Sequence, residues 1–347
     1  MSTDSDSYTI IVNTYNRHKY LKRLLNFYDQ YDDHINILIL DSSSKDPDKE
    51  LNLLFDKKNI EYHRYVPSTF MPEKIAKGCK YIKTPYVLIC ADDDFAIPQA
   101  ILKCVNFLNQ NTDYSSAQGV TYKHLVSGND KEINFIFKKS IVNARSIDDD
   151  KPIKRLSRYC KDHTLCNTYY SVQRSELFSK IWKESSLYAN DWAMAEFFPC
   201  SMSLLYGKMK VLPFFYASRE ANQIRWYNYK RLSEMYSTKN LSKSSTGLAN
   251  QLCLINKISW EKSLKKITYL LNIYASHALK KKNSDFFLRK LRRGLSKINE
   301  IFYKNIKKDN CIIFEDDYNK VKEIVLKYGN LEYLSKKTRL DYSTQGK

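Results

Sequence analysis

Short apolar runs alternate with stretches of helical periodicity over the first 125 residues. We predict strands at residues 8–14, 35–40, 60–65 and 86–90, and the last of these is apolar enough to be fully buried. After the first run, the spacing of apolar side chains predicts an amphipathic helix, through Tyr20, Leu21, Leu24, Leu25 and Tyr28. Strands that alternate with helices are typical of βαβ units, so we predict an α/β fold with a mostly parallel sheet flanked by helices.

The pattern changes in the second half of the chain. Residues 192–198 form a strongly apolar stretch that predicts a buried helix, with Asp191 at or near its N-cap. The run at 211–215 contains Pro213, which lacks a backbone N–H, so we predict an edge strand there. From residue 230 to 347 the chain is rich in Leu, Ile and Lys at helical spacing. We therefore predict a domain of residues 1–229 and a helical C-terminal subdomain of residues 230–347.

The charge of the 347-residue chain is strongly positive and unevenly distributed. The formal net charge is +19, and residues 251–347 carry 22 Lys and Arg against 10 Asp and Glu. A basic C-terminal third is typical of a protein with an anionic partner, such as a membrane surface, a phosphorylated carrier or a nucleic acid. A solvated helical surface in a Lys-rich chain explains the same charge equally well.

The sequence also bears on where the protein acts. The first seven residues are polar and acidic, unlike a secretory signal, and no apolar run reaches the roughly 18–20 residues that cross a bilayer. The eight cysteines are scattered and several stand in apolar segments, which favours reduced thiols over a disulfide framework. We expect a cytoplasmic protein.

Three consecutive carboxylates follow the most apolar of the predicted strands. Asp92, Asp93 and Asp94 stand directly after residues 86–91, at the carboxyl end of a strand that we expect in the centre of the sheet. Ligands of open α/β sheets bind at this edge. A divalent cation such as Mn²⁺ or Mg²⁺ would offset the repulsion among the three carboxylates. An acidic turn before a helix beginning at Pro98 is the alternative interpretation.

Taken in order, these features resemble the nucleotide-sugar-binding half of a family 2 glycosyltransferase with the GT-A fold. The motifs are the loop 13–17 after the first strand, Asp41-Ser42-Ser43 after the second, a helix with Lys74 and Gly78, and the acidic triplet. The resemblance covers residues 8–125 well and 160–226 more loosely, and it explains nothing of residues 230–347. It implies a nucleotide-sugar-binding half at 8–125 and an acceptor half at 126–229.

The resemblance implies roles for several donor-site residues. The loop against the nucleotide base and ribose would consist of Asn13, Thr14, Tyr15 and Asn16. Asp41 would accept a hydrogen bond from the base, usually uracil, although a turn residue explains it equally well. Lys74 would face the diphosphate, with an exposed helix lysine as the alternative. In the acidic triplet, Asp94 is the expected direct metal ligand, Asp92 is shared between ribose and metal, and Asp93 lies in the donor site.

Inverting members of the family deprotonate the acceptor hydroxyl with a carboxylate at a helix N-terminus, commonly in a Glu-Asp pair. Here the matching pair is Asn190-Asp191, which leaves Asp191 as the candidate base and a plain N-cap as its alternative role. Four further residues are candidates for acceptor or diphosphate contacts, namely His163, Arg219, Arg225 and Trp226. The last two belong to a segment resembling a Gln-x-x-Arg-Trp motif that is one residue short.

The sequence thus predicts an inverting, metal-assisted glycosyltransferase. The resemblance implies a nucleotide-sugar donor of the UDP class and a glycan or lipid-linked acceptor, in bacterial surface polysaccharide synthesis. The basic C-terminal region would hold the enzyme at the inner face of the membrane. A metal-dependent nucleotidyl or phosphoryl transferase is an alternative, against which no Gly-rich phosphate loop is present. A basic nucleic-acid-binding protein is another, against which no recognised motif is present.

Overall fold

The computed structural model describes residues 7–31, 35–57, 59–129, 132–139, 145–162, 168–220, 238–292 and 311–328. Its strands are β1 (Tyr8–Thr14), β2 (Asn36–Asp41), β3 (Ile60–Arg64), β4 (Tyr86–Ala91), β5 (Phe95–Ala96), β6 (Tyr114–Asn129), β7 (Glu132–Lys139), β8 (Val172–Arg174) and β9 (Lys208–Glu220). Its helices are α1 (His18–Tyr28), α2 (Lys49–Phe55), α3 (Met71–Gly78), α4 (Pro98–Gln110), α5 (Pro152–Lys161), α6 (Ser175–Tyr188), α7 (Trp192–Tyr206), α9 (Thr238–Asn256), α10 (Trp260–Arg292) and α11 (Glu315–Tyr328).

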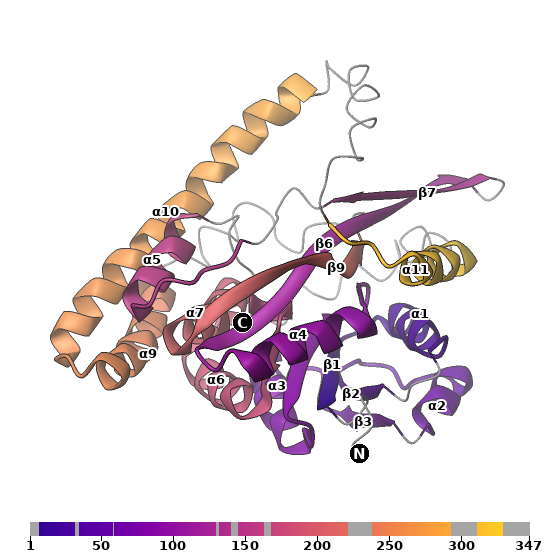
Figure 1. The fold of residues 1–347 in the computed structure, drawn as a ribbon, viewed down its shortest axis with the longest axis horizontal. Coiled ribbons are helices and arrows are strands. Elements are labelled where there is room, and N and C mark those ends of the chain that lie inside the picture. The colour runs from indigo at the N-terminus through magenta and orange to yellow at the C-terminus, as the bar shows by residue number, and fades with distance from the viewer. Residues whose placement is uncertain are drawn as a thin grey trace.

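The strands form one sheet in the order β3-β2-β1-β4-β8-β6-β9-β5, with β7 paired to β6 in a hairpin that projects from the body (Figure 1). The first four strands of this order are parallel, as the alternation of strands and helices predicts. Strand β8 runs antiparallel to both of its neighbours, β4 and β6. The predicted α/β fold is confirmed, and the second half of the sheet is mixed.

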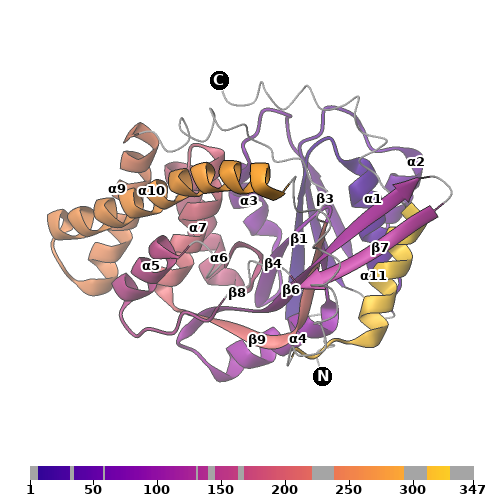
Figure 2. The same ribbon diagram turned by 90° about the horizontal axis from the view of Figure 1, so that it is seen from above.

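Strands β1, β2 and β4 are buried on both faces, which explains why they are largely apolar, whereas the outermost strand β3 is only partly buried and carries polar side chains. Ile10 and Val12 of β1 belong to the apolar cluster that includes α1, α4 and α11, whereas Ile11 belongs to the cluster with α3, α6 and α7. Helices α1, α2 and α11 lie on one side of the strands and α3, α6 and α7 on the other (Figure 2). The carboxyl ends of β1, β2 and β4 therefore meet at one edge, between two helical layers.

Residues 211–215 belong to β9, which pairs with β6 on one side. On the other side β5 pairs only with Ala217 and Ser218, and an isolated bridge joins Phe214 to Ile312, so among the described residues this stretch has a full strand partner on one side, as an edge strand does. The register of β9 on β6 shifts between Val211 and Phe215, so Pro213 falls in an irregular stretch that needs no ladder N–H from it. Its carbonyl accepts a hydrogen bond from the backbone N–H of Ile312.

The helices beyond residue 238 complete the two apolar layers of the sheet domain. Leu252 of α9 and Leu271 of α10 are buried in the cluster that contains α7. On the opposite face, Ile324 of α11 joins the cluster that contains α1, and the Tyr31 hydroxyl donates to Asp317 at 2.7 Å. The boundary predicted at residue 229 lies outside the described residues. None of the described helices is both long and apolar enough to cross a membrane.

Candidate functional site

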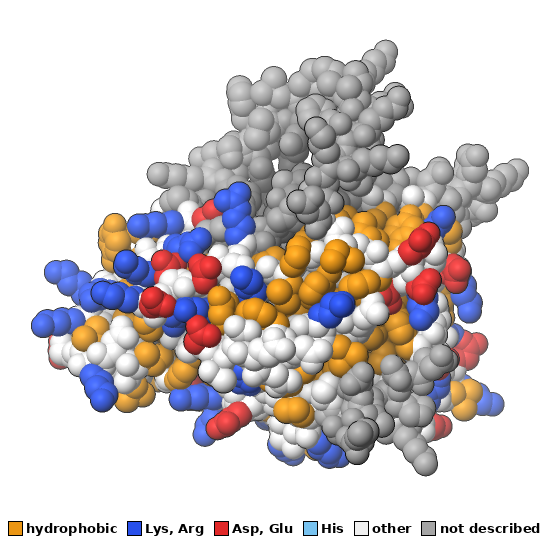
Figure 3. Space-filling model, viewed as in Figure 1, with side chains coloured by type: hydrophobic (Ala, Val, Ile, Leu, Met, Phe, Trp, Pro, Cys, Tyr) orange, Lys and Arg blue, Asp and Glu red, His pale blue; other side chains and the backbone are white. Residues whose placement is uncertain are grey.

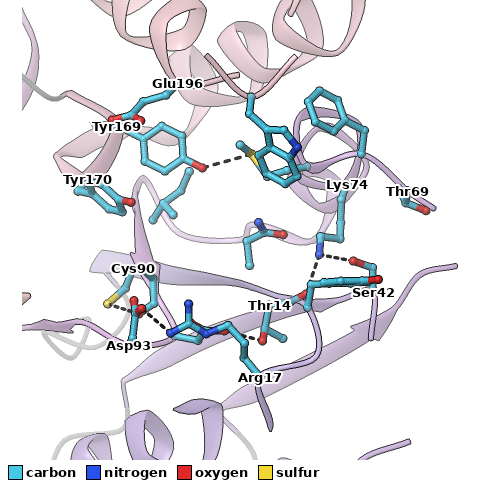
Figure 4. A pocket seen from close by; sticks show the side chains of 18 of the residues that line it. Thr14, Arg17, Ser42, Thr69, Lys74, Cys90, Asp93, Tyr169, Tyr170 and Glu196 are labelled. Carbon is cyan, nitrogen blue, oxygen red and sulfur yellow. Dashed lines mark hydrogen bonds and ion pairs between the residues drawn. The ribbon is translucent and has the colours of Figure 1, made fainter. Parts of the chain in front are cut away.

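A cavity of about 240 Å³ opens at the carboxyl ends of β1 and β4 (Figure 4). One wall comes from the loop after β1, the first turn of α3 and the end of β4, and the opposite wall comes from η3 (Thr168–Tyr170), α7 and the end of β9. The predicted residues that line it are Asn13, Thr14, Tyr15, Lys74, Asp92, Asp93 and Arg219. This edge of the sheet thus gathers side chains that are far apart in the sequence.

Not every predicted residue lines the cavity. Asn16, Asp41, Asp94 and Asp191 lie next to residues that do, but they do not contribute to its lining. Three predictions fall on residues outside the described part of the chain, namely His163, Arg225 and Trp226. Their roles stay predictions.

The loop after β1 is fixed by hydrogen bonds to the neighbouring strand ends. The Thr14 hydroxyl donates to Asp92 at 2.7 Å. Asn16 has a φ of 53°, a left-handed conformation that Asn tolerates well, and its backbone N–H donates to the Ser43 hydroxyl at 2.7 Å. Its side-chain oxygen accepts from the Ser44 backbone N–H at 2.8 Å. Asn16 therefore shapes the loop that lines the cavity.

Asp41 is fully buried and all of its nearby partners are donors. The Ser43 backbone N–H donates to one carboxylate oxygen at 2.7 Å, while His18 Nε2 and the Tyr62 hydroxyl lie 2.8 and 3.0 Å from the other. Burial raises the pKa of Asp41, but the hydrogen bonds from His18 and Ser43 outweigh it and hold that pKa below its usual range. Asp41 is therefore an ionised carboxylate at neutral pH.

Lys74 is a buried cation on the same side of the cavity. Its Nζ donates to the Thr14 carbonyl oxygen at 2.8 Å and lies 2.7 Å from the Ser42 hydroxyl. Burial lowers the pKa of Lys74 to about 7, although the charges of Asp41 and Asp92 act in the opposite direction. The sequence could not show this burial, because an exposed helix lysine has the same local pattern.

The three carboxylates after β4 are buried, and each has an arginine as its neighbour. Arg17 Nη2 lies 2.5 Å from Asp93, and its Nε lies 3.2 Å from Asp92. Arg219 Nε donates to Asp94 at 2.9 Å. Burial raises the pKa of Asp92 to about 6 and that of Asp94 to about 7, even though the arginines oppose this. A further positive charge nearby would therefore stabilise the ionised forms of Asp92 and Asp94.

A second buried ion pair connects this triplet to β9. Arg23 of α1 is 1% exposed, and its Nη2 donates to Glu220 at 2.6 Å and to the Asp93 carbonyl oxygen at 3.1 Å. The Glu220 backbone N–H donates to Asp94 at 3.2 Å. Burial raises the pKa of Glu220, but His124 and Arg23 lower it to about 2. The pair fixes the end of β9 against the loop that carries the carboxylates.

Sequence reasoning assigned no role to Arg17, Arg23 and Glu220. Arg17 stands in the motif after the first strand, so its position was a usable signal. Arg23 and Glu220 are 197 residues apart and carried no local signal.

The residues around the triplet fit a divalent cation whose coordination is completed by oxygens of a bound anion or of water. Carboxylate oxygens are the ligands that Mn²⁺ and Mg²⁺ prefer. Burial raises the pKa values of Asp92 and Asp94 because it disfavours their charged forms, and a bound cation would favour those forms again. Among the described residues, no three His, Cys, Asp or Glu side chains converge on one point. A cation here would therefore need oxygens from a ligand or water.

Helix α7 begins at the edge of the cavity. Asp191 is its N-cap, and one carboxylate oxygen accepts from the backbone N–H groups of Ala193 and Met194 at 2.9 and 3.1 Å. The other oxygen, Oδ2, is buried and has no hydrogen-bond partner among the residues that the structure describes. Burial raises the pKa of Asp191, and the two backbone hydrogen bonds lower it by less. Trp192, the next residue, and Glu196, one turn later, line the cavity.

Three comparisons with known proteins bear on this arrangement. The sequence model of glycosyl transferase family 2 matches residues 9–182, half of the chain. This span includes β1, β2, β4 and the acidic triplet, and it ends before α7. No curated protein matches the sequence.

Solved structures with a similar fold include S. aureus TarS 1–349 in complex with UDP-GlcNAc, with a TM-score of 0.53 and 16% identity over 78% of this chain and 73% of that one. The same protein in complex with UDP gives a TM-score of 0.51 and 15% identity, over 78% of this chain and 72% of that one. At this identity the likeness concerns the fold.

Proposed function

The chain belongs to glycosyltransferase family 2, and from that membership we propose that it transfers a sugar from a UDP-sugar donor to an acceptor hydroxyl, with inversion at the sugar carbon. The carrying observation is that Asn13, Lys74 and Asp92, which come from three separate motifs of the family, line one cavity at the carboxyl ends of the parallel strands. The UDP class is taken from the TarS structures, which hold UDP-GlcNAc and UDP.

In this proposal the wall formed by the β1 loop and α3 holds the donor. Lys74 and Arg17 are the cations that line this wall, and a diphosphate carries the opposite charge. Asp41 lies behind this wall and would accept a hydrogen bond from the nucleotide base. The base N–H would replace the Tyr62 hydroxyl, which lies 3.0 Å from the Asp41 carboxylate. Asn13, Thr14 and Tyr15 would lie against the base and ribose.

Asp94 and Asp92 are the residues that would hold Mn²⁺ or Mg²⁺, with the donor diphosphate completing the ligand set. GT-A enzymes of family 2 commonly use such a cation, which neutralises the charge that develops on the departing nucleoside diphosphate. Arg17 and Arg219 line the same cavity and are held there by ion pairs with Asp93 and Asp94. Their positions are fixed before the donor binds.

Asp191 is the proposed base. Its Oδ2 accepts no hydrogen bond from the described part of the chain, while the N-cap bonds made through its other oxygen hold the carboxylate still. A raised pKa makes it a better proton acceptor than an exposed aspartate at the same pH, provided that the pH lies above that pKa. In the reaction, Oδ2 takes the proton of the acceptor hydroxyl while the hydroxyl oxygen attacks the sugar carbon and the diphosphate leaves.

The acceptor is proposed to be a glycan or a lipid-linked intermediate of surface polysaccharide synthesis, reached at the inner face of the membrane. The support is a basic surface over α5, α9 and α10, where Lys and Arg side chains gather on the left of the view in Figure 3. The described basic residues of this surface include Lys154, Arg158, Lys243, Lys262, Lys265 and Lys266. Such a surface attracts anionic lipid headgroups, by about 1 kcal/mol for each basic side chain near them.

The test is hydrolysis of UDP-, GDP-, CDP- and dTDP-sugars by the purified full chain, each with Mn²⁺, with Mg²⁺ and with EDTA. We expect slow, metal-dependent release of UDP from one donor, and its loss in the Asp92→Asn/Asp94→Asn double variant. Glu176→Gln, at an exposed position of α6, is the control for loss of a carboxylate. Lys74→Met is a second donor-site variant in case the double variant does not fold. No turnover and no thermal shift with any donor would refute the proposal.

A further inference from the structure

The wall of the cavity opposite the donor residues has a different chemistry. It is lined by Tyr169, Tyr170, Trp192 and Glu196, with Arg219 at its end. Figure 4 shows Tyr169, Tyr170 and Glu196 across the cavity from Arg17 and Asp93. A diphosphate is anionic, so the Glu196 carboxylate is the wrong charge to hold it, and the donor cations Lys74 and Arg17 lie on the other wall. The proposed donor site therefore leaves this wall unexplained.

The aromatic side chains of this wall are held in place by their neighbours. The Trp192 ring packs edge-to-face on Phe70, with ring centroids 5.2 Å apart. Tyr170 lies under the Arg219 guanidinium, which is 4.3 Å from its ring centroid. Tyr169 donates to Met71 Sδ at 3.2 Å. A wall that is rigid before binding loses little entropy when a ligand stacks on it.

Glu196 is the acidic residue of this wall. It stands four residues after Trp192 on α7, so both side chains project from the same face of the helix into the cavity. Its charge acts on the hydroxyl of Tyr170, whose pKa is raised by burial and further by Glu196. A carboxylate accepts hydrogen bonds and cannot donate them, so it selects a ligand that brings O–H or N–H groups.

We propose that Trp192 and Glu196 form the acceptor subsite, which binds an uncharged sugar ring by stacking on the indole and by accepting a hydrogen bond from a ring hydroxyl. A sugar ring combines an apolar C–H face with hydroxyl donors at its edge, which matches this pair of side chains. The assignment rests on the proposed function, since it places the acceptor beside Asp191, the residue before Trp192. A phosphate group at this position would be repelled by Glu196.

The test measures binding of neutral methyl glycosides of hexoses and N-acetylhexosamines to the full chain by saturation-transfer NMR, with hexose phosphates as the anionic comparison. We expect at least one neutral glycoside to bind the wild-type protein. Glu196→Gln should weaken that binding about tenfold or more, because it removes a charge-assisted hydrogen bond. Trp192→Leu should abolish the signal. Glu176→Gln and Trp260→Phe, on α6 and on the exposed start of α10, are the matched controls and should bind as the wild type does.

Three results would overturn the assignment: no neutral glycoside binds the wild type, hexose phosphates bind in their place, or the signal survives in both variants. Each titration is repeated with UDP present, and UDP affinity is measured separately by thermal shift. We expect the two variants to bind UDP within about twofold of the wild type. If the wild type does not bind UDP, the donor assignment is refuted. The acceptor subsite is judged separately, from the glycoside signals alone.

Discussion

Replacing Asp191 with asparagine separates the two roles that this carboxylate is proposed to have. One oxygen accepts from the N–H groups of Ala193 and Met194, and the other has no hydrogen-bond partner within the described ranges. An asparagine side-chain oxygen can accept the same two bonds, and Asn and Asp are about equally good N-caps. Asparagine cannot take a proton from a hydroxyl at neutral pH. Asp191→Asn should therefore remove the base and keep the cap.

The expected magnitudes differ enough to be measured separately. Loss of a general base lowers turnover by about 10²–10⁴-fold, which corresponds to roughly 3–5 kcal/mol in the activation barrier. The free energy of unfolding should change by less than about 0.5 kcal/mol in Asp191→Asn, whereas Asp191→Ala should lose about 0.5–2 kcal/mol because the cap is gone. Turnover is measured as UDP release from the donor, and stability by urea unfolding.

The pH dependence gives a third readout. The folded pKa of Asp191 lies above its unfolded value, so the native state holds the proton more tightly and stability falls as pH rises from the ordinary Asp range through that folded pKa. Turnover should rise over the same window as the base ionises. In Asp191→Asn the part of each change that is due to Asp191 should be absent, while the changes due to Asp92 and Asp94, whose pKa values are raised to about 6 and 7, should remain. If this variant keeps turnover within threefold of the wild type, Asp191 is not the base, and if it unfolds as readily as Asp191→Ala, the capping argument is wrong.

Three further outcomes are expected. Lys74→Met should weaken donor binding by about 10- to 100-fold. The donor affinity of the wild type should fall as pH rises above about 7, where Lys74 loses its proton, while the affinity of the variant stays level. Calorimetry at several pH values would contradict this if the affinities of the two proteins changed in parallel. Ile324→Ala should destabilise the whole domain by about 2–5 kcal/mol in one transition, and a separate early transition in urea would show that α11 unfolds alone. Gly119→Ala would place a methyl group 2.5 Å from the Phe214 carbonyl oxygen and should cost about 1–3 kcal/mol in unfolding free energy, and an unchanged urea midpoint would contradict it.

Local patterns were sufficient for the parallel half of the fold. Strands such as residues 86–91 are buried on both faces and therefore apolar at every position, which is visible in the sequence. Pro213 is tolerated in β9 because it falls where the register on β6 shifts and where β5 does not pair with the strand. The sequence gives no sign of that shift, since it depends on how β6 and β9 align.

The sequence by itself determined which motifs stand at the ends of the first parallel strands, and parallel strands end at one edge of a sheet. Thr14 and Asp92 lie at two such strand ends, Lys74 lies in helix α3, and all three line the same cavity. Only the tertiary structure decided the ionisation of these groups. Burial lowers the pKa of Lys74 and raises that of Asp92, and the Arg23–Glu220 pair joins residues almost 200 positions apart. Desolvation and long-range pairing depend on which surfaces pack together, and no local pattern encodes that.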